Sequence, residues 1–139
     1  MITEDYVSFE TAKLLKEKGF AEPCRFIYDA GYFCSIASRD CRWNEGYGEL
    51  IEELPNSEFS GIDNRISAPT LAMTMKWLRE VHNIFITITF RFSRNADNDI
   101  NFSYYAEKYE NHYGYGDGEF NSYEEACEAA IKYCLEDLI

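Results

Sequence analysis

The residues best suited to catalysis are few and lie far apart in the sequence. Only two histidines, His82 and His112, could act as general bases, and a base needs a nucleophile and an orienting group beside it. His82 stands at the predicted end of a helix, where its charge would favour the helix dipole, and His112 lies in a tyrosine-rich segment. We therefore assign no catalytic residue. A small thiol-dependent enzyme that pairs Cys34 with a histidine is kept as a second alternative.

The sequence also lacks the residue spacing that is typical of metal-binding and phosphate-binding sites. A zinc site prefers Cys or His pairs two to four residues apart, whereas successive cysteines within each half of the chain are separated by nine or six residues. Residues 97–101 open like a calcium loop, but Phe102 and Lys108 occupy its sixth and twelfth positions. The glycines of 114–118 precede a helix, yet the acidic residues around them would repel phosphate, so we predict a turn there. We expect neither a metal nor a cofactor.

Charge argues against a nucleic-acid partner. The net charge is −12, and residues 97–139 carry eleven acids against only Lys108 and Lys132. Nucleic-acid affinity depends on neutralising phosphates, and an acidic protein repels polyanions. The segment 67–96 is nevertheless locally basic, with Glu80 as its one acid. A nucleic-acid-contacting regulator is therefore the first alternative, and its candidate binding residues are Lys76, Arg79, Arg91 and Arg94.

The element that would position most of these bases is a helix followed directly by a strand. Ser67 is a predicted N-cap, and apolar residues at helical spacing predict a helix over 70–81 with two buried stripes. The stripes are Leu71, Met75 and Leu78, and Met73, Trp77 and Val81. Asn83 suits the left-handed conformation that ends a helix. Strict alternation then predicts a strand over 84–92.

A second alternating run predicts a hairpin partner for that strand over 100–109, after a polar loop over 93–99. Pairing Phe92 with Ile100 places Phe90 opposite Phe102, so that the apolar faces coincide. Residues 122–125 form a capping box ahead of a final helix over 123–138. Its predicted buried face is Tyr123, Ala126, Cys127, Ala130, Ile131, Cys134, Leu135 and Leu138.

The first half begins with a predicted helix over 8–18, capped by Ser8 and ended by Gly19. Runs over 24–28 and 32–36 predict a hairpin around a turn at 29–31. Residues 38–66 form a long irregular connection with a short helix at 49–54, or else they hide a strand. The order αββ-loop-αββα predicts one α+β domain over 1–139, with a largely antiparallel sheet and helices on one face.

The start of the sequence lacks the features of a signal peptide, and no apolar run reaches the length of a membrane span, so we expect a cytoplasmic protein away from membranes. In that compartment the five cysteines should be free thiols. They are Cys24, Cys34, Cys41, Cys127 and Cys134.

Three segments, residues 6–20, 67–83 and 122–139, resemble small uncharacterised proteins encoded by bacterial genomes and their phages or prophages. The resemblance covers about half of the chain. It implies a mobile-element setting but no activity and no site residue. Our leading hypothesis is a non-enzymatic accessory protein that binds a protein partner or forms a homo-oligomer.

Overall fold

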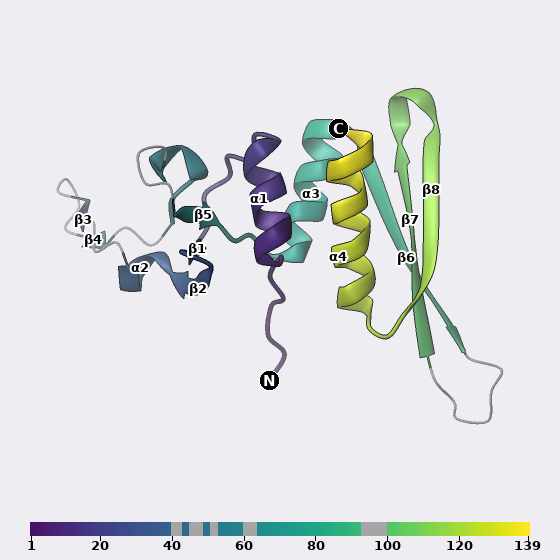
Figure 1. Ribbon diagram of the computed structural model, residues 1–139, viewed down its shortest axis with the longest axis horizontal. Coiled ribbons are helices and arrows are strands. Elements are labelled where there is room, and N and C mark those ends of the chain that lie inside the picture. The colour runs from purple at the N-terminus through teal and green to yellow at the C-terminus, as the bar shows by residue number, and fades with distance from the viewer. Residues whose placement is uncertain (40–42, 45–48, 51–52, 60–63, 93–99) are drawn as a thin grey trace. The chain divides into compact units, whose positions relative to one another are not determined.

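A computed structural model of the protein describes residues 1–39, 43–44, 49–50, 53–59, 64–92 and 100–139. The chain divides into two compact units, one formed by Tyr6–Thr70 and the other by Met1–Asp5 with Leu71–Ile139 (Figure 1). The described strands form two antiparallel three-stranded sheets and a two-stranded pair, and helices alternate with them along the sequence. The predicted α+β class is therefore confirmed. The predicted single domain stays a prediction, and we describe each unit by itself.

The first unit begins with α1 (Phe9–Glu17), and both of its ends agree with the sequence prediction. The Ser8 hydroxyl accepts a hydrogen bond from the Thr11 amide at 3.2 Å, which satisfies one of the free amides of the first turn. Gly19 has a φ of +86°, and the Phe20 amide donates to the Leu15 carbonyl at 2.9 Å. These are the marks of a Schellman ending, which turns Phe20 into the core, where it is 1% exposed.

The predicted hairpin of the first unit is also confirmed, as β1 (Phe26–Asp29) and β2 (Tyr32–Ser35). Its turn residues Ala30 and Gly31 both have positive φ, as a tight two-residue hairpin turn requires. A short helix, α2 (Ile36–Arg39), follows β2. The core beneath the hairpin consists of Ile27, Ile36, Leu54 and Phe59.

The predicted connection over 38–66 contains more regular structure than the sequence indicates. Its described parts are β3 (Trp43–Asn44), β4 (Glu49–Leu50), the 3-10 turn η1 (Asn56–Phe59) and β5 (Arg65–Ser67). The predicted helix at 49–54 is wrong, because Glu49 and Leu50 pair with β3 and Leu54 forms a bridge with Cys24. The alternative of a hidden strand is correct, since β5 completes the sheet in the order β2-β1-β5.

The buried side chain of Asn56 explains why Ser67 is not a helix cap. Asn56 accepts a hydrogen bond from the Ser67 amide at 2.8 Å and donates one to the Phe20 carbonyl at 3.0 Å. Ser67 is thereby held as the last residue of β5, opposite Ile27 of β1. The predicted N-cap at Ser67 is wrong, and the next helix begins four residues later.

In the second unit, α3 (Leu71–His82) leads directly into β6 (Ile84–Phe92), with Asn83 at a φ of +54° as predicted. β6 pairs with β7 (Ile100–Lys108) in the predicted register, including Phe92 opposite Ile100 and Phe90 opposite Phe102. The predicted loop over 93–99 and its calcium-like residues lie outside the described part of the chain.

The glycine-rich segment predicted as a turn is a strand. After the short turn η2 (Tyr109–Asn111), β8 (Tyr113–Phe120) pairs with β7 and gives the sheet order β6-β7-β8. The prediction failed because glycine weakens strand propensity and marks turns in a sequence. In the structure, pairing with β7 outweighs the low strand propensity of glycine.

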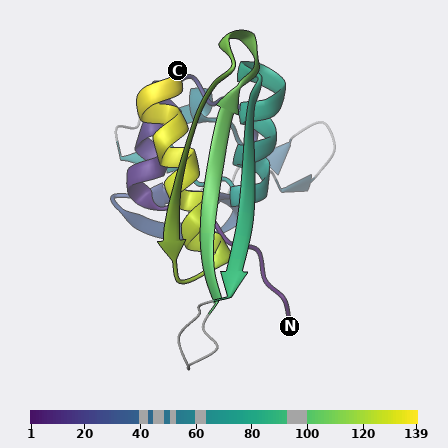
Figure 2. The same cartoon turned by 90° about the vertical axis from the view of Figure 1, so that its right-hand side faces the viewer.

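The chain ends in α4 (Tyr123–Tyr133), which continues as a π-helical turn, η3 (Cys134–Leu138). Ser122 caps α4 by accepting from the Glu125 amide at 3.1 Å, and the Glu125 carboxylate accepts from the Asn121 amide at 3.2 Å. Helices α3 and α4 pack together on one face of the sheet β6-β7-β8, as predicted (Figure 2).

Burial in these two helices follows the prediction in the middle of each helix and departs from it at the edges. Trp77 is 6% exposed and Leu78 is fully buried, whereas Met73 is 37% and Val81 55% exposed. The second predicted stripe is therefore only partly correct, because α3 covers β6, the outermost strand, and has fewer neighbours there. In α4 the predicted face is buried from Ala126 to Leu138, but Tyr123 is 46% exposed.

Candidate functional site

The sheet β6-β7-β8 buries one face under two helices and leaves its other face exposed. Alternation places on the open face the four β6 residues Phe85, Thr87, Thr89 and Arg91, all of them exposed. Opposite them stand Asn101, Ser103, Tyr105 and Glu107 of β7, followed by Gly114, Gly116 and Gly118 of β8. We call this surface the open sheet face. No described helix or strand of this unit covers it.

Two of the three glycines, Gly114 and Gly116, are explained by the side chain of Tyr105. A β-carbon at Gly114 would overlap the Tyr105 hydroxyl oxygen and lie 2.5 Å from the ring atom that carries it. At Gly116 a β-carbon would lie 3.0 Å from the Tyr104 carbonyl oxygen and 3.3 Å from the Tyr105 ring. The tyrosine ring thus lies directly across the glycine backbone, an arrangement by which an aromatic residue compensates for glycine in an edge strand.

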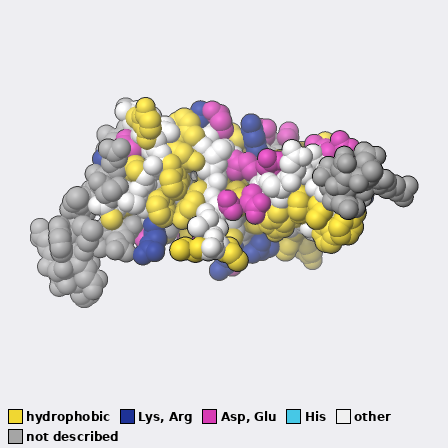
Figure 3. All heavy atoms as spheres, turned by 90° about the horizontal axis from the view of Figure 1, so that it is seen from below, with side chains coloured by type: hydrophobic (Ala, Val, Ile, Leu, Met, Phe, Trp, Pro, Cys, Tyr) yellow, Lys and Arg dark blue, Asp and Glu magenta, His cyan; other side chains and the backbone are white. Residues whose placement is uncertain are grey.

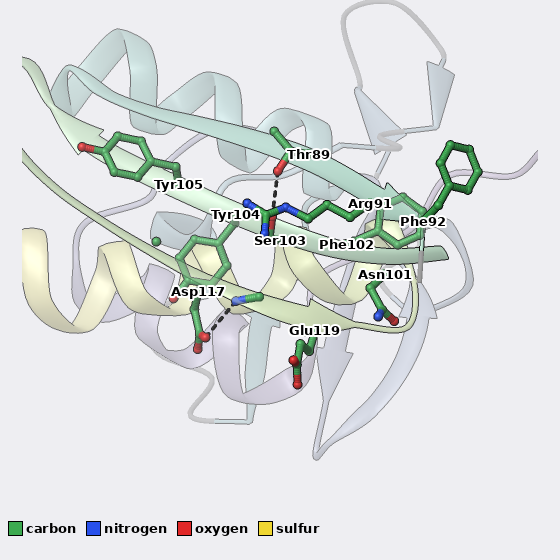
Figure 4. Close-up of a pocket in the computed structure, with 12 residues that line it drawn as sticks. Thr89, Arg91, Phe92, Asn101, Phe102, Ser103, Tyr104, Tyr105, Asp117 and Glu119 are labelled. Atoms are coloured by element: carbon green, nitrogen blue, oxygen red, sulfur yellow. Dashed lines mark hydrogen bonds between the residues drawn. The ribbon is translucent and has the colours of Figure 1, made fainter. Parts of the chain in front are cut away.

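A shallow groove of about 600 Å³ runs across the open sheet face (Figure 4). Its centre holds a hydroxyl pair, Thr89 and Ser103, whose oxygens are 2.7 Å apart. Arg91 lies beside this pair, and Asp117 and Glu119 line the β8 side of the groove. The groove can therefore offer hydroxyl groups and one guanidinium group for hydrogen bonding, next to two carboxylates.

The β8 side of the groove is shaped by a bulge. The pairing of β7 and β8 shifts between Phe102 and Tyr104, and Glu119 takes a φ of +74°. Asp117 accepts a hydrogen bond from the Gly118 amide at 2.8 Å. The bulge bends the end of β8, where both carboxylates line the groove.

Beneath the groove, aromatic rings pack against one another on the covered face of the sheet. Tyr104 is 6% exposed on the covered face, and its ring lies 5.9 Å from Phe120 and 6.3 Å from Tyr133 between centroids. Burial, followed by the nearby Asp117 carboxylate, raises the pKa of Tyr104 to about 12. Tyr104 therefore stays neutral at physiological pH and serves as a packing residue.

A second exposed feature lies at the end of the β6–β7 hairpin. Phe102 packs against Tyr123, the first residue of α4, with ring centroids 6.3 Å apart. Beyond that point the apolar face of the hairpin continues, and Phe90, Phe92 and Ile100 are 60%, 70% and 43% exposed. Hydrophobic side chains gather at this end in Figure 3. We call these three residues the hairpin-end cluster.

The four basic residues of the nucleic-acid alternative do not share one surface. Lys76 and Arg79 are exposed on α3, on the covered side of the sheet, and Lys76 lies 3.9 Å from the Glu80 carboxylate. Arg91 is on the open sheet face, and Arg94 lies outside the described residues. The three described bases are thus separated by the sheet itself.

The thiol chemistry considered for this chain has little support from local geometry. Cys24, Cys34, Cys127 and Cys134 are free, as predicted, while Cys41 lies outside the described residues. Burial raises the pKa of the Cys24 and Cys134 thiols to about 12, which keeps them protonated and poorly nucleophilic. Cys34 belongs to the first unit, and both histidines belong to the second.

The two histidines differ in their surroundings. The His82 ring lies 4.6 Å from that of Trp77, and burial, followed by the nearby Lys108 ammonium, lowers the pKa of His82. A lowered pKa keeps the ring neutral, so the predicted charge–dipole role at the helix end is weakened. His112 is exposed, with a φ of +50° and its ring nitrogen 3.9 Å from a Glu107 oxygen.

Two features that would indicate a function are absent from the described residues. These residues contain no group of three or more His, Cys, Asp or Glu residues arranged to hold a metal ion. Within the same part of the chain, no helix combines the length and the apolar character needed to span a bilayer.

Comparison of the chain with family models, with curated proteins and with solved structures found no match. The site must therefore be interpreted from its own residues.

Proposed function

We propose that this protein is a non-enzymatic accessory protein that binds a protein partner through the open sheet face. The observation that carries the proposal is the asymmetry of the sheet β6-β7-β8. Two helices pack on one face, while the other presents Phe85 and Tyr105 at 47% and 46% exposure. Aromatic residues and arginine are the types enriched at protein interfaces, and Arg91 lies on the same face.

The arrangement of these residues supports a compact binding surface. Phe85 is paired with Glu107 and Thr87 with Tyr105, so Phe85 and Tyr105 are diagonal neighbours across β6 and β7. Diagonal side chains in a sheet are within reach of each other when they are aromatic. Thr87 is opposite Tyr105, and the Thr89–Ser103 hydroxyl pair is the next pair on this face. These hydroxyl groups supply hydrogen bonds beside an apolar centre.

Charge supports a basic partner. The chain carries a net charge of −12, and the rim of the groove contributes Asp117 and Glu119. Complementary charge steers association and suppresses wrong partners. The partner we propose therefore presents lysine or arginine side chains around an apolar or aromatic centre. A mobile-element setting, implied by the resemblance of three segments to proteins of bacterial genomes and their phages or prophages, belongs to the same proposal. So does the cytoplasmic location expected from the sequence.

Site-specific photo-crosslinking in cells tests this function. A photoreactive phenylalanine at Thr87, on the open sheet face, is compared with one at Lys132, on the exposed side of α4. We expect a discrete adduct with a protein other than this chain from position 87 alone, and we expect it to disappear when Phe85→Ser and Arg91→Ser are added. The purified partner should then bind the unmodified chain in titration calorimetry. The same adducts from both positions, or none from position 87, would refute the proposal.

The nucleic-acid alternative has one observation in its favour. Exposed aromatic rings on an open sheet, with an arginine nearby, are the features that stack unpaired bases in RNA-binding sheets. Against this, the groove contains a single described cation and two carboxylates. We therefore keep the protein partner as the conclusion.

A further inference from the structure

β6 is an edge strand without any of the usual protections. The sheet order is β6-β7-β8, and no described strand pairs with the other side of β6. Its nine residues contain no proline, no glycine and no lysine, and Arg91 is the only charged residue among them. The opposite edge, β8, is interrupted by glycines and a bulge. Natural proteins blunt an edge with charge, proline or a bulge unless that edge is used for pairing.

The hydrogen bonding of the hairpin shows which residues of β6 face this edge. The Tyr109 amide donates to the Asn83 carbonyl at 3.0 Å, one step beyond the pair formed by Ile84 and Lys108. Hydrogen-bonded and non-hydrogen-bonded pairs alternate in an antiparallel ladder. Odd-numbered residues of β6 therefore bond to β7, and the amides and carbonyls of its even-numbered residues point to the free edge.

We infer that β6 pairs with β6 of a second copy of this chain, antiparallel, about a two-fold axis at Ile88. The two sheets would join into one sheet of six strands. The hydrogen-bonded pairs would be Ile88 with Ile88 of the second copy, Ile86 with Phe90, and Ile84 with Phe92. These are all even-numbered residues, as the free edge requires, and opposite residues share a face, so the helices of both copies lie on the same side.

This register covers the apolar side chains that the single chain leaves exposed. Phe90 and Phe92 of one copy lie beside Ile86 and Ile84 of the other, at the end of β6 that α3 covers. Val81 continues the buried stripe of Trp77 at helical spacing and stands three residues before Ile84, yet it is 55% exposed. The same pairing brings it next to Phe92. This one pairing would therefore explain why Val81, Phe90 and Phe92 are exposed in the single chain.

The other face of β6 is equally self-complementary. The non-hydrogen-bonded pairs would be Phe85 with Arg91 and Thr87 with Thr89. An arginine beside an aromatic ring is attractive, and facing threonines are a favourable cross-strand pair. The two Arg91 side chains would be separated by six residues along the sheet, roughly 20 Å, so they do not repel at close range.

Other two-fold registers satisfy fewer of these conditions. An axis at Ile86 leaves Phe90 and Phe92 without partners. An axis at Phe90 leaves the four residues from Ile84 to Thr87 without a partner in the other β6 and brings the two Arg91 side chains close together. Only the axis at Ile88 pairs all nine residues of β6. A second copy is therefore the occupant that the sequence of this strand fits.

Analytical ultracentrifugation of the full chain tests the association. A mass of twice the 16.2 kDa of the chain is expected at micromolar concentration. Because each copy carries a charge of −12, added salt should strengthen the dimer by screening this repulsion. Phe92→Lys should raise the dissociation constant at least tenfold without changing the melting temperature of the monomer. Tyr32→Lys, at an equally exposed aromatic residue of β2, is the matched control and should leave the dimer unchanged.

Disulfide trapping tests the register. In a Cys34→Ala and Cys41→Ala background, Thr87→Cys and Thr89→Cys are made as separate proteins. Non-hydrogen-bonded pairs bring β-carbons close enough for a disulfide after small shifts. Mild oxidation of the mixture should give a covalent dimer, whereas each protein alone should give none. The inference is independent of the proposed partner, because neither test uses one. A monomer at 100 µM, or equal trapping by each variant alone, would overturn it.

Discussion

The ring of Tyr105 on β7 lies across the backbone of Gly114 on β8, so closely that a methyl group at position 114 would overlap the tyrosine hydroxyl. The glycine and the tyrosine therefore depend on each other. This contact constrains how closely β8 can lie beside β7 on the open sheet face.

The first prediction concerns this pair. Gly114→Ala should destabilise the protein by about 1–3 kcal/mol, because a well-packed site that receives an extra carbon must shift. Adding Tyr105→Ser should recover part of the loss, which a double-mutant cycle in urea would measure. Gly118→Ala is the matched control, since its β-carbon would lie 3.3 Å from the Ser103 β-carbon and meet no ring. Additive effects of the two changes would disprove the contact.

The second prediction concerns the helix-covered core. Trp77 is 6% exposed, so Trp77→Ala should cost about 3–5 kcal/mol of unfolding free energy through lost burial and a remaining cavity. Met73 is on the same helix and is 37% exposed, and Met73→Ala should cost much less. Thermal melts followed by circular dichroism compare the two. Equal losses would mean that the inner face of α3 has been assigned wrongly.

The third prediction is a pH dependence. Burial raises the pKa of Cys134 from 9.0 to about 12 and that of Cys127 from 9.0 to about 11. Above about pH 9 the unfolded thiols lose protons that the folded ones retain, so unfolding becomes more favourable as the pH rises toward 11–12. Urea melts at about pH 8 and about pH 10 should show this decline.

The control for the pH dependence is the double variant Cys127→Ala and Cys134→Ala. Its unfolding free energy should decline less steeply with rising pH. Cys24 and Tyr104, whose pKa values are also raised, keep part of the effect. Native Cys127 and Cys134 should also resist thiol reagents until the protein unfolds, because both are fully buried. An unchanged slope in the double variant would contradict the assignment.

The fourth prediction is that the protein does not bind DNA or RNA at physiological salt. Such binding depends mainly on neutralising phosphates. The candidate residues Lys76 and Arg79 lie on one side of the sheet and Arg91 on the other, in a protein of net charge −12. Fluorescence anisotropy with random duplex and single-stranded oligonucleotides at about 150 mM salt is the measurement. Micromolar binding that is lost on Arg91→Ala with Arg94→Ala would favour the nucleic-acid alternative instead.

Local sequence signals predicted α1, α4, β6 and β7 well, because each of them contains a cap or a long periodic run. Ser8, Gly19 and Asn83 take the conformations that their chemistry favours. The register of β6 on β7 followed from alternation alone. Where the local sequence preference and the tertiary packing favour the same structure, an element can be predicted from a single sequence.

Two of the strands that were not predicted, β5 and β8, fail that condition for different reasons. β5 is three residues long and is held by the distant Asn56 side chain, which no local pattern reveals. β8 has glycine at every second position, and its stability depends on Tyr105 of another strand. An alternation of glycine with larger residues over 114–119 was the available signal for β8. The groove depends on β8, so the candidate site could not be predicted either.

The way the chain passes between its two units has a consequence for how this protein could have been assembled. A bridge between Tyr6 and Thr70 closes the first unit, and a 2.9 Å hydrogen bond from the Leu71 amide to the Asp5 carbonyl closes the second. The first and last residues of the first unit are therefore neighbours. So are the two residues at which the chain leaves the second unit and returns to it. This is the topology of an insertion, in which one module interrupts another between two adjacent residues of its surface. The 65 residues from Tyr6 to Thr70 could be exchanged for a short linker without separating the ends that they leave behind.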